Sequence, residues 1–237
     1  MRILITGAFG QLGHALQSAL SKKSNYELIC TGRKIKKSQE GIPLDIRNQV
    51  ALKEIINTTA PDILINLAAM TNVDACELNP KLAGEINVAG LEHICDSFKG
   101  KIIHLSTDYV FDGTSGPYKE DDPLNPISIY GKTKLASEYI LLEKDIKNLV
   151  IRGNVLYDYS PHTSASFLNW VVSSLKGNQE IKVVEDQFNN PTWTRSMSEI
   201  IELSIENDLE GIIHWGDSEH ISRFEFAKLI AKKFSLN

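Results

Sequence analysis

The chain opens with Met1-Arg2-Ile3-Leu4-Ile5-Thr6-Gly7-Ala8-Phe9-Gly10-Gln11-Leu12-Gly13. This stretch begins as an apolar strand, passes through Gly-x-x-Gly-x-x-Gly and continues into an apolar spacing typical of a helix. Glycines between a strand and a helix let backbone amides approach a pyrophosphate at the positive end of the helix. For these residues alone, the alternative is a tight strand-to-helix turn in another kind of α/β protein. We predict a nucleotide cofactor site that is contacted by Gly7, Phe9, Gly10, Gln11, Leu12 and Gly13.

Strands and helices alternate along the rest of the chain. Continuous apolar runs predict strands at 2–6, 26–31, 62–67, 101–106, 148–152, 181–184 and 211–215. Helical spacing predicts helices at 11–22, 49–58, 80–98, 127–143, 165–175, 195–207 and 223–234. This alternation predicts an α/β fold with a doubly wound parallel sheet of the Rossmann type. We expect residues 1–152 to form a dinucleotide-binding domain, with strands returning to it near 181–184 and 211–215, and residues 153–237 to form mainly a small substrate-binding lobe.

The composition is that of an ordinary globular protein. Of the 237 residues, 42% are hydrophobic, and the net charge is −5. Lysine pairs are scattered and no apolar run approaches the roughly 20 residues of a spanning helix, so we expect no nucleic-acid or membrane partner. Cys30, Cys76 and Cys95 form no Cys-x-x-Cys and the histidines lack ligand spacing. This pattern predicts reduced thiols, no metal and a cytoplasmic location. The oligomeric state is open, with a homodimer as the candidate assembly.

The end of the second predicted strand bears on the choice of cofactor. Enzymes that prefer NAD usually place a carboxylate there, on the ribose 2′-hydroxyl. This chain instead reads Cys30-Thr31-Gly32-Arg33-Lys34, and a guanidinium can clamp a 2′-phosphate. We therefore expect NADP(H) to be preferred over NAD(H) through Arg33. The alternative is a solvated basic turn with no part in binding.

Two stretches carry the candidate chemistry. One predicted strand ends in Ser106-Thr107, and the helix that follows it places Tyr130 and Lys134 four positions apart, on one face. A hydroxyl, a phenol and an ammonium that converge on a nicotinamide form a site for carbonyl reduction. There the phenol donates a proton, the hydroxyl holds the carbonyl oxygen, and the lysine binds the cofactor ribose and lowers the pKa of the phenol.

The chain resembles the extended short-chain dehydrogenases/reductases, and within them the dTDP-4-dehydrorhamnose reductase family. Besides the glycine turn and the Tyr-x-x-x-Lys helix, the resemblance lies in Leu44–Ile46, Asn66–Asp74, Ile86–Gly90, Ser106–Gly113 and Asp186–Thr192. It implies hydride transfer to the C4 carbonyl of a nucleotide-linked 4-keto-6-deoxy sugar, in the synthesis of activated deoxysugars for polysaccharide. The implied catalytic triad is Thr107, Tyr130 and Lys134; the implied cofactor contacts add Asp45, Ile46, Leu67, Ala68 and Ala69; and the implied substrate contacts are Thr71, Thr107, Asp108, Asn190 and Thr192.

Related activities limit this assignment. Sugar-nucleotide 4,6-dehydratases follow the threonine with Asp-Glu, whereas here Asp108 is followed by Tyr109, so elimination lacks its base. A nucleotide-sugar epimerase stays an alternative because it needs little beyond the same triad. A second alternative is a non-catalytic, NADP-binding regulatory subunit that resembles the β subunit of methionine adenosyltransferase.

The chain also departs from the family pattern. Arg152-Gly153-Asn154-Val155 lacks the tryptophan that is common after the fifth main strand, and Met70 stands where an aromatic residue or histidine is common. The chain ends at Asn237, where relatives continue, so we expect either a short member of the family or a truncated chain. These departures leave the identity of the sugar open.

Overall fold

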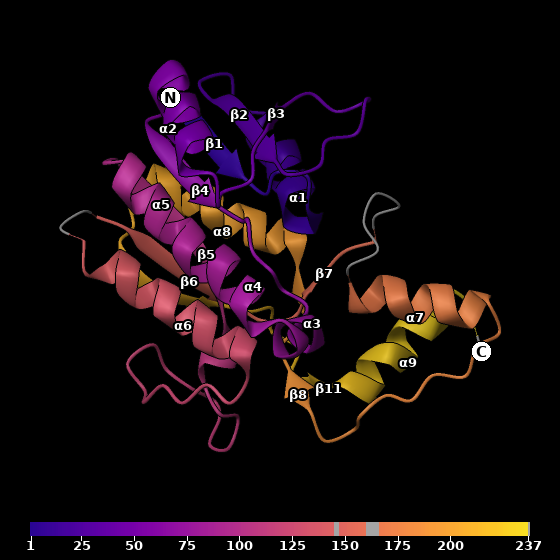
Figure 1. Ribbon diagram of the computed structural model, residues 1–237. Coiled ribbons are helices and arrows are strands. Elements are labelled where there is room, and N and C mark those ends of the chain that lie inside the picture. The colour runs from indigo at the N-terminus through magenta and orange to yellow at the C-terminus, as the bar shows by residue number, and fades with distance from the viewer. Residues whose placement is uncertain (145–146, 160–165, 237) are drawn as a thin grey trace.

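A seven-stranded sheet forms the centre of the computed structural model, which describes residues 1–144, 147–159 and 166–236. The strand order is β10-β6-β5-β4-β1-β2-β3, and every neighbouring pair is parallel (Figure 1). The predicted doubly wound parallel sheet is therefore confirmed. The strands span Arg2–Thr6 (β1), Glu27–Gly32 (β2), Ile42–Pro43 (β3), Ile63–Asn66 (β4), Lys101–Thr107 (β5), Leu149–Gly153 (β6) and Gly211–Trp215 (β10).

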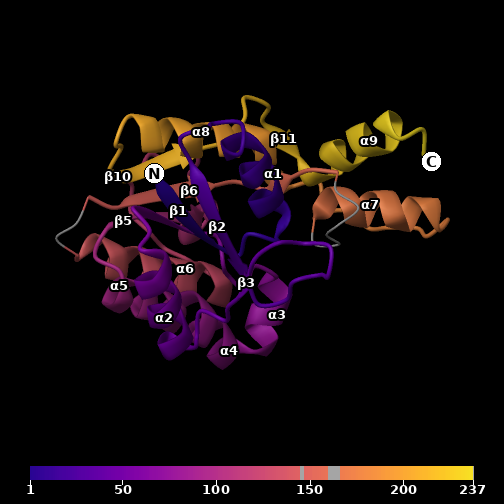
Figure 2. The same ribbon diagram turned by 90° about the horizontal axis from the view of Figure 1, so that it is seen from above.

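Helices cover both faces of this sheet (Figure 2). In β1, β4, β5 and β6, odd-numbered residues such as Ile3 and Ile65 pack against α1 (Gln11–Leu20) and α8 (Thr194–Glu206). Even-numbered residues, such as Leu4 and Leu64, pack against α2 (Gln49–Thr59), α5 (Gly90–Ser97) and α6 (Ile129–Leu142). Because successive side chains of a strand point to opposite faces, strands buried on both faces read as the continuous apolar runs seen in the sequence.

Short helices connect the layers near the carboxyl ends of β4 and β5. They are α3 (Val73–Leu78), α4 (Pro80–Gly84), the π-helix η1 (Glu85–Ala89) and the 3₁₀-helix η2 (Asp108–Val110). The single helix predicted at 80–98 is present, as α4, η1 and α5 in succession, with a π-helical segment in its middle. Such segments are rare and often occur at functional sites.

A third apolar cluster lies beside the sheet rather than on it (Figures 1 and 2). It is built by α7 (Phe167–Lys176) and α9 (Arg223–Lys233), with the antiparallel pair β8 (Phe188–Asn189) and β11 (Ile221–Ser222) at its base. A further pair, β7 (Leu156–Tyr157) and β9 (Thr192–Trp193), connects this region to the sheet. The predicted start of α7 at Ala165 lies outside the described residues.

The strand predicted at 181–184 is wrong. Those four residues form no strand, although Ile181 and Val183 are partly buried against the third cluster. Their alternating apolar side chains cover α7 and α9, and their backbone pairs with no described strand. The strand at Gly211–Trp215, by contrast, joins the edge of the main sheet beside β6, as expected.

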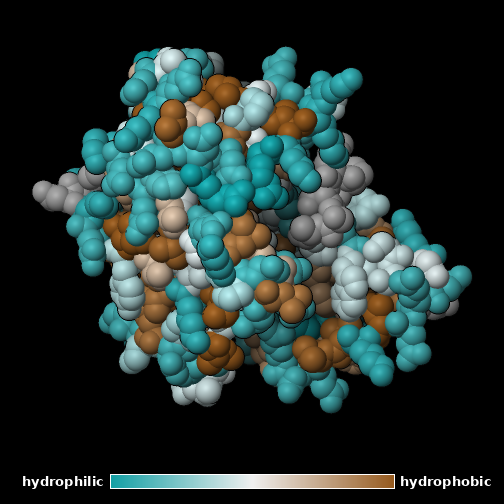
Figure 3. Space-filling model, viewed as in Figure 1, coloured by the Kyte–Doolittle hydropathy of each residue, from teal (hydrophilic) through white to brown (hydrophobic). Residues whose placement is uncertain are grey.

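The surface matches the composition of the chain. In the view of Figure 3, hydrophobic residues are interspersed with hydrophilic ones rather than gathered into one band. In the described part of the chain, no helix is both long and apolar enough to cross a membrane. Cys30, Cys76 and Cys95 are free thiols, as predicted.

Candidate active site

The glycine turn after β1 packs closely against neighbouring backbone of this chain. Gly7 has φ +69°, and a Cβ there would lie 2.7 Å from the amide nitrogen of Ala68. A Cβ on Gly13 would lie 2.3 Å from the carbonyl oxygen of Ala8, so this glycine lets α1 pack tightly against the turn. Among the described residues, no side chain caps α1, and its first turn holds no acidic group. The amides at this helix terminus therefore suit a pyrophosphate.

The other residues predicted in this turn have distinct positions. The Phe9 ring packs against Gly32 at the end of β2, so closely that a Cβ on Gly32 would lie only 2.8 Å from Cδ2 of the ring. Gln11 donates from Nε2 to the carbonyl oxygen of Asp158 at 3.1 Å. Leu12 is buried in the core. Only backbone groups of Leu12 are thus placed for a cofactor contact.

Basic residues flank Asp45 beside the glycine turn. Arg33 is exposed directly after β2, whereas Ile46 is buried. Arg47 binds Asp45 with two guanidinium nitrogens, Nη2 lying 2.6 Å from Oδ2. The pKa of Asp45 is lowered, chiefly by this hydrogen bonding with Arg47 and to a smaller extent by the nearby charge of Arg33. Sequence reasoning missed Arg47, which follows the Asp45-Ile46 motif directly.

We expect the Arg33→Ala variant to bind NADPH roughly 10- to 100-fold more weakly, because it loses a charge-assisted contact to the 2′-phosphate of about 1.5–3 kcal/mol. NADH affinity should change less than about twofold, since NADH lacks that phosphate. Fluorescence titration of both cofactors measures the effect, with Lys34→Ala as the control for a neighbouring exposed charge. Equal weakening of both cofactors, or of neither, would contradict the clamp.

The segment after β4 forms the next part of the site. Leu67, Ala68 and Ala69 follow the strand directly and are partly buried, while Thr71 is exposed. Asn87 holds this segment in place: its Oδ1 accepts from the amide of Met70 at 2.8 Å, and its Nδ2 donates to the Met70 carbonyl at 3.1 Å. The same Nδ2 lies 3.0 Å from Oγ1 of Thr133 on α6. Sequence reasoning did not assign Asn87 a role, although Asn87 lies in the Ile86–Gly90 stretch that carries part of the resemblance.

The three predicted catalytic residues gather at the carboxyl end of β5. Thr107 ends the strand, and its Oγ1 donates to Oδ1 of Asp108 at 3.1 Å and accepts from the Tyr109 amide at 3.2 Å. Tyr130 lies at the start of α6, where the Thr107 side chain acts on the pKa of its phenol, and it packs edge-on against the Tyr109 ring, with the ring centroids 5.7 Å apart. Lys134 follows one turn later and is only 2% exposed.

Burial dominates the electrostatics of this site. It raises the pKa of Tyr130, and the influence of the Thr107 side chain opposes that rise only in part. Lys134 does not lower the pKa of Tyr130 as expected; its Nζ lies 3.0 Å from Nε2 of His104. Burial also lowers the pKa of Lys134 to about 7, against the opposing charge of Glu138. The phenol therefore keeps its proton and can act as an acid.

Asp108 is the predicted substrate contact next to the triad. Burial raises the pKa of its carboxyl to about 6, while the hydrogen bond from Thr107 and the charge of Arg223 at the start of α9 oppose the rise. The neighbouring Tyr109 accepts a hydrogen bond from Nε2 of Gln187 at 3.4 Å. The Asp186–Thr192 stretch, distant in sequence, thus reaches the same edge of the sheet.

A buried ion pair lies beneath the triad. Glu138 on α6 binds Arg152 on β6, with Nη2 2.8 Å from Oε2, and both side chains are 1% exposed. Ser106 donates a short hydrogen bond to the same carboxylate. Arg152 also donates to the Glu120 carbonyl at 3.1 Å and lies over the Phe111 ring. The pair thereby fixes α6 to the two strands under the site and to the loop that follows β5.

The side chains of Asn190 and Thr192 form hydrogen bonds with backbone carbonyl groups in this structure. Asn190 donates from Nδ2 to the Asp217 carbonyl at 3.0 Å. Thr192 is fully buried, and its hydroxyl donates to the Asn190 carbonyl at 3.0 Å. These contacts shape the chain between β8 and β9, and direct contact of either side chain with a sugar stays a prediction.

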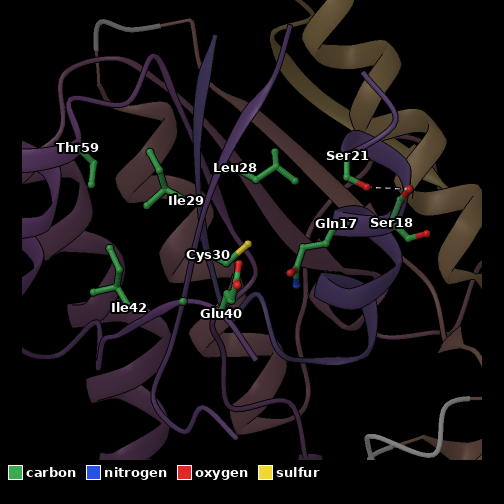
Figure 4. Close-up of a pocket in the computed structure, with 10 residues that line it drawn as sticks. Gln17, Ser18, Ser21, Leu28, Ile29, Cys30, Glu40, Ile42 and Thr59 are labelled. Atoms are coloured by element: carbon green, nitrogen blue, oxygen red, sulfur yellow. Dashed lines mark hydrogen bonds between the residues drawn. The ribbon is translucent and has the colours of Figure 1, made fainter. Parts of the chain in front are cut away.

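Other candidate sites lie away from the triad or lack ligands. A hollow at the edge of the sheet is lined by residues of α1, β2 and β3, among them Gln17, Cys30 and Ile42 (Figure 4). None of the triad residues lines it. Within the described ranges, no group of three or more His, Cys, Asp and Glu side chains could hold a metal ion.

Comparison with known proteins places this site in a family. The chain is 33% identical over 239 residues to the spore coat polysaccharide biosynthesis protein SpsK of Bacillus subtilis, covering 99% of this chain and 80% of that one. It is 32% identical to a dTDP-4-dehydrorhamnose reductase of Aggregatibacter actinomycetemcomitans, covering 95% and 76%. It is 31% identical to the methionine adenosyltransferase 2 subunit beta of Xenopus laevis, covering 99% and 72%.

A solved structure and a family model agree with these relatives. The dTDP-4-dehydrorhamnose reductase of Bacillus anthracis in complex with NADP superposes with a TM-score of 0.87 at 33% identity, covering 100% of this chain and 81% of that one. The model of the RmlD substrate binding domain matches residues 1–237. The chain therefore belongs to the RmlD, or dTDP-4-dehydrorhamnose reductase, family of extended short-chain dehydrogenases/reductases.

Proposed function

We propose that this protein is an NADPH-dependent reductase that converts the C4 carbonyl of a nucleotide-linked 4-keto-6-deoxy sugar into a hydroxyl. One observation carries the proposal. Thr107 ends β5, Tyr130 lies close enough at the start of α6 for the Thr107 side chain to lower the pKa of its phenol, and Lys134 follows one helical turn later on α6. In a doubly wound sheet, the ligand site lies at the carboxyl ends of the strands, where the glycine turn after β1 also lies.

The proposed reaction needs one hydride and one proton. A bound reduced nicotinamide supplies the hydride to the carbonyl carbon. Thr107 holds the carbonyl oxygen by a hydrogen bond, and Tyr130 transfers its hydroxyl proton to that oxygen, so that the C=O bond becomes a C–O–H group. Lys134 in its ammonium form stabilises the resulting phenolate. Burial keeps Tyr130 protonated before the transfer, which suits an acid rather than a base.

Residues 153–237 are proposed to supply most of the sugar-binding lobe. The third cluster has its own apolar core, and Gln187 and Arg223 beside it reach toward Tyr109 and Asp108. A sugar would then lie between this cluster and the end of β5, in a site formed at the junction of two units. The similarity to SpsK favours an activated deoxysugar used in polysaccharide synthesis.

The decisive experiment measures NADPH consumption with purified nucleotide-linked 4-keto-6-deoxy sugars. dTDP-4-dehydrorhamnose is the first substrate to try, followed by the same sugar on UDP and GDP. We expect oxidation of NADPH in proportion to the sugar consumed, with a 4-hydroxy sugar as product by NMR. Interconversion of two keto sugars without net loss of NADPH would instead identify an epimerase.

A binding subunit is the second candidate, because the chain is 31% identical to the methionine adenosyltransferase 2 subunit beta. That reading predicts tight NADPH binding without turnover of any sugar in the panel. It also predicts a stable complex with a methionine adenosyltransferase catalytic subunit, which size-exclusion chromatography would detect. Turnover without such a complex would exclude it.

A further inference from the structure

A row of buried polar side chains runs through the interior beneath the triad. Nζ of Lys134 lies 3.0 Å from Nε2 of His104, whose ring is itself only 1% exposed. Nε2 also lies 3.1 Å from Oγ of Ser137, one turn of α6 beyond Lys134. His104 is therefore a buried core residue that directly contacts Lys134.

The row continues from His104 across two more strands. Nδ1 of His104 lies 3.1 Å from Nδ2 of Asn66 on β4, and Oδ1 of Asn66 accepts from Oγ1 of Thr6 on β1 at 2.6 Å. Thr6, Asn66 and His104 are register partners on adjacent parallel strands. Thr6 directly precedes Gly7 of the glycine turn. Polar contacts of 2.6–3.1 Å therefore run from the turn to Lys134 without leaving the protein interior.

This arrangement restrains two otherwise adaptable groups. A lysine side chain has four rotatable bonds, and fixing it costs roughly 2 kcal/mol of rotamer entropy unless contacts hold it. The His104 ring cannot turn without breaking contacts at both of its nitrogens. Burial, with a smaller contribution from Lys134, holds the pKa of His104 well below its usual value, so the ring is neutral. It therefore adds no second charge beside Lys134. Because Nδ2 of Asn66 can only donate, Nδ1 accepts and Nε2 carries the hydrogen, which it can donate to Oγ of Ser137 or to the unprotonated amine of Lys134, whose pKa is lowered to about 7 by burial.

We infer that His104 is a positioning residue, which fixes Nζ of Lys134 and ties its place to the glycine turn through Asn66 and Thr6. The inference rests on the proposed function only in that Lys134 contacts the bound cofactor. Loss of His104 should therefore lower NADPH affinity, and it should lower the rate of turnover as a second effect.

A double-mutant cycle on NADPH affinity tests the inference, because two residues that act through one contact give non-additive effects. We expect His104→Leu to weaken NADPH binding roughly tenfold in the otherwise unchanged chain and less than twofold in the Lys134→Met variant. His104→Gln, which restores a polar group near Nζ, should recover most of the loss. The same cycle on kcat should show the same pattern if sugar is turned over.

Asn148→Leu is the matched control. Asn148 is also buried and also joins β5 to α6, through the Ile102 amide at 3.0 Å and the Leu141 carbonyl at 3.2 Å, but at the opposite end of the sheet. It should lower the melting temperature and leave NADPH affinity within twofold of wild type.

Several results would overturn the inference. Equal losses from His104→Leu in the wild-type chain and in the Lys134→Met variant would mean that His104 acts on the fold alone, as would an equal loss in Asn148→Leu. If His104→Leu does not fold, Asn66→Ala takes its place in the cycle: a loss of roughly threefold that disappears in Lys134→Met supports the inference, and a loss that persists overturns it. A wild-type protein that binds NADPH but turns over no sugar contradicts the proposed function and leaves this cycle interpretable.

Discussion

Replacing Tyr130 by phenylalanine should lower the rate of sugar reduction by roughly 10²–10⁴, the range typical for loss of a general acid. The substitution keeps the aromatic ring, including its edge-on contact with Tyr109, and removes only the hydroxyl. NADPH affinity should stay within about twofold, because binding does not require proton transfer. Steady-state kinetics with a saturating nucleotide sugar and a fluorescence titration of NADPH measure the two effects.

Tyr139→Phe is the control for Tyr130→Phe. Tyr139 lies on the same helix but is 52% exposed, and its substitution should change the rate less than twofold. Near-normal turnover of the Tyr130→Phe variant would mean that another group donates the proton.

Replacing Glu138 by glutamine should destabilise the protein by about 3–5 kcal/mol, because the buried guanidinium of Arg152 then lacks its carboxylate. The two side chains are 1% exposed and are joined by Nε and Nη2 of the guanidinium, so solvent cannot substitute for the lost charge. For a chain of this size, that loss corresponds to a fall in melting temperature of roughly 6–20 °C. Thermal unfolding followed by circular dichroism measures it.

Two comparisons sharpen this experiment. Glu199→Gln breaks an exposed pair with Arg195, at 58% and 63% exposure, and should cost less than about 1 kcal/mol. Replacing Glu138 and Arg152 together by leucine and methionine should restore part of the lost stability, because no unpaired charge stays buried. If Glu138→Gln melts within about 2 °C of wild type, as roughly 1 kcal/mol or less would imply, the pair does not stabilise the fold.

The strands and helices of the main sheet were predictable because burial leaves a periodic trace. β1 matches its prediction, and Ile3, Leu4 and Ile5 are fully buried, as a continuous apolar run suggests. The two-residue strands β7, β8, β9 and β11 are too short to show a period. The short apolar run at 181–184 reads as a strand, but Ile181 and Val183 instead pack against the third cluster, which α7 and α9 build.

The candidate site shows a similar division. The triad could be proposed from one strand end and one helical spacing, and the structure gathers its members. The supporting residues His104 and Glu138 were missed because each contacts a residue on another element: His104 on β5 contacts Lys134 on α6, and Glu138 on α6 contacts Ser106 on β5. Each reads as an ordinary polar residue until strand and helix are known to face each other. The raised pKa of Tyr130 depends on burial in three dimensions and leaves no trace in a local pattern.

The third cluster constrains how this protein can diversify. Its two helices, α7 and α9, are separated in the chain by α8 and β10, which belong to the main sheet. Recombination at a single pair of crossover points therefore cannot exchange the cluster without also exchanging a strand and a helix of the cofactor-binding half. Point substitutions avoid this obstacle, since the apolar core of the cluster is separate from the two cores of the sheet. A protein engineer who transplants this region must graft residues 166–189 and 221–236 together.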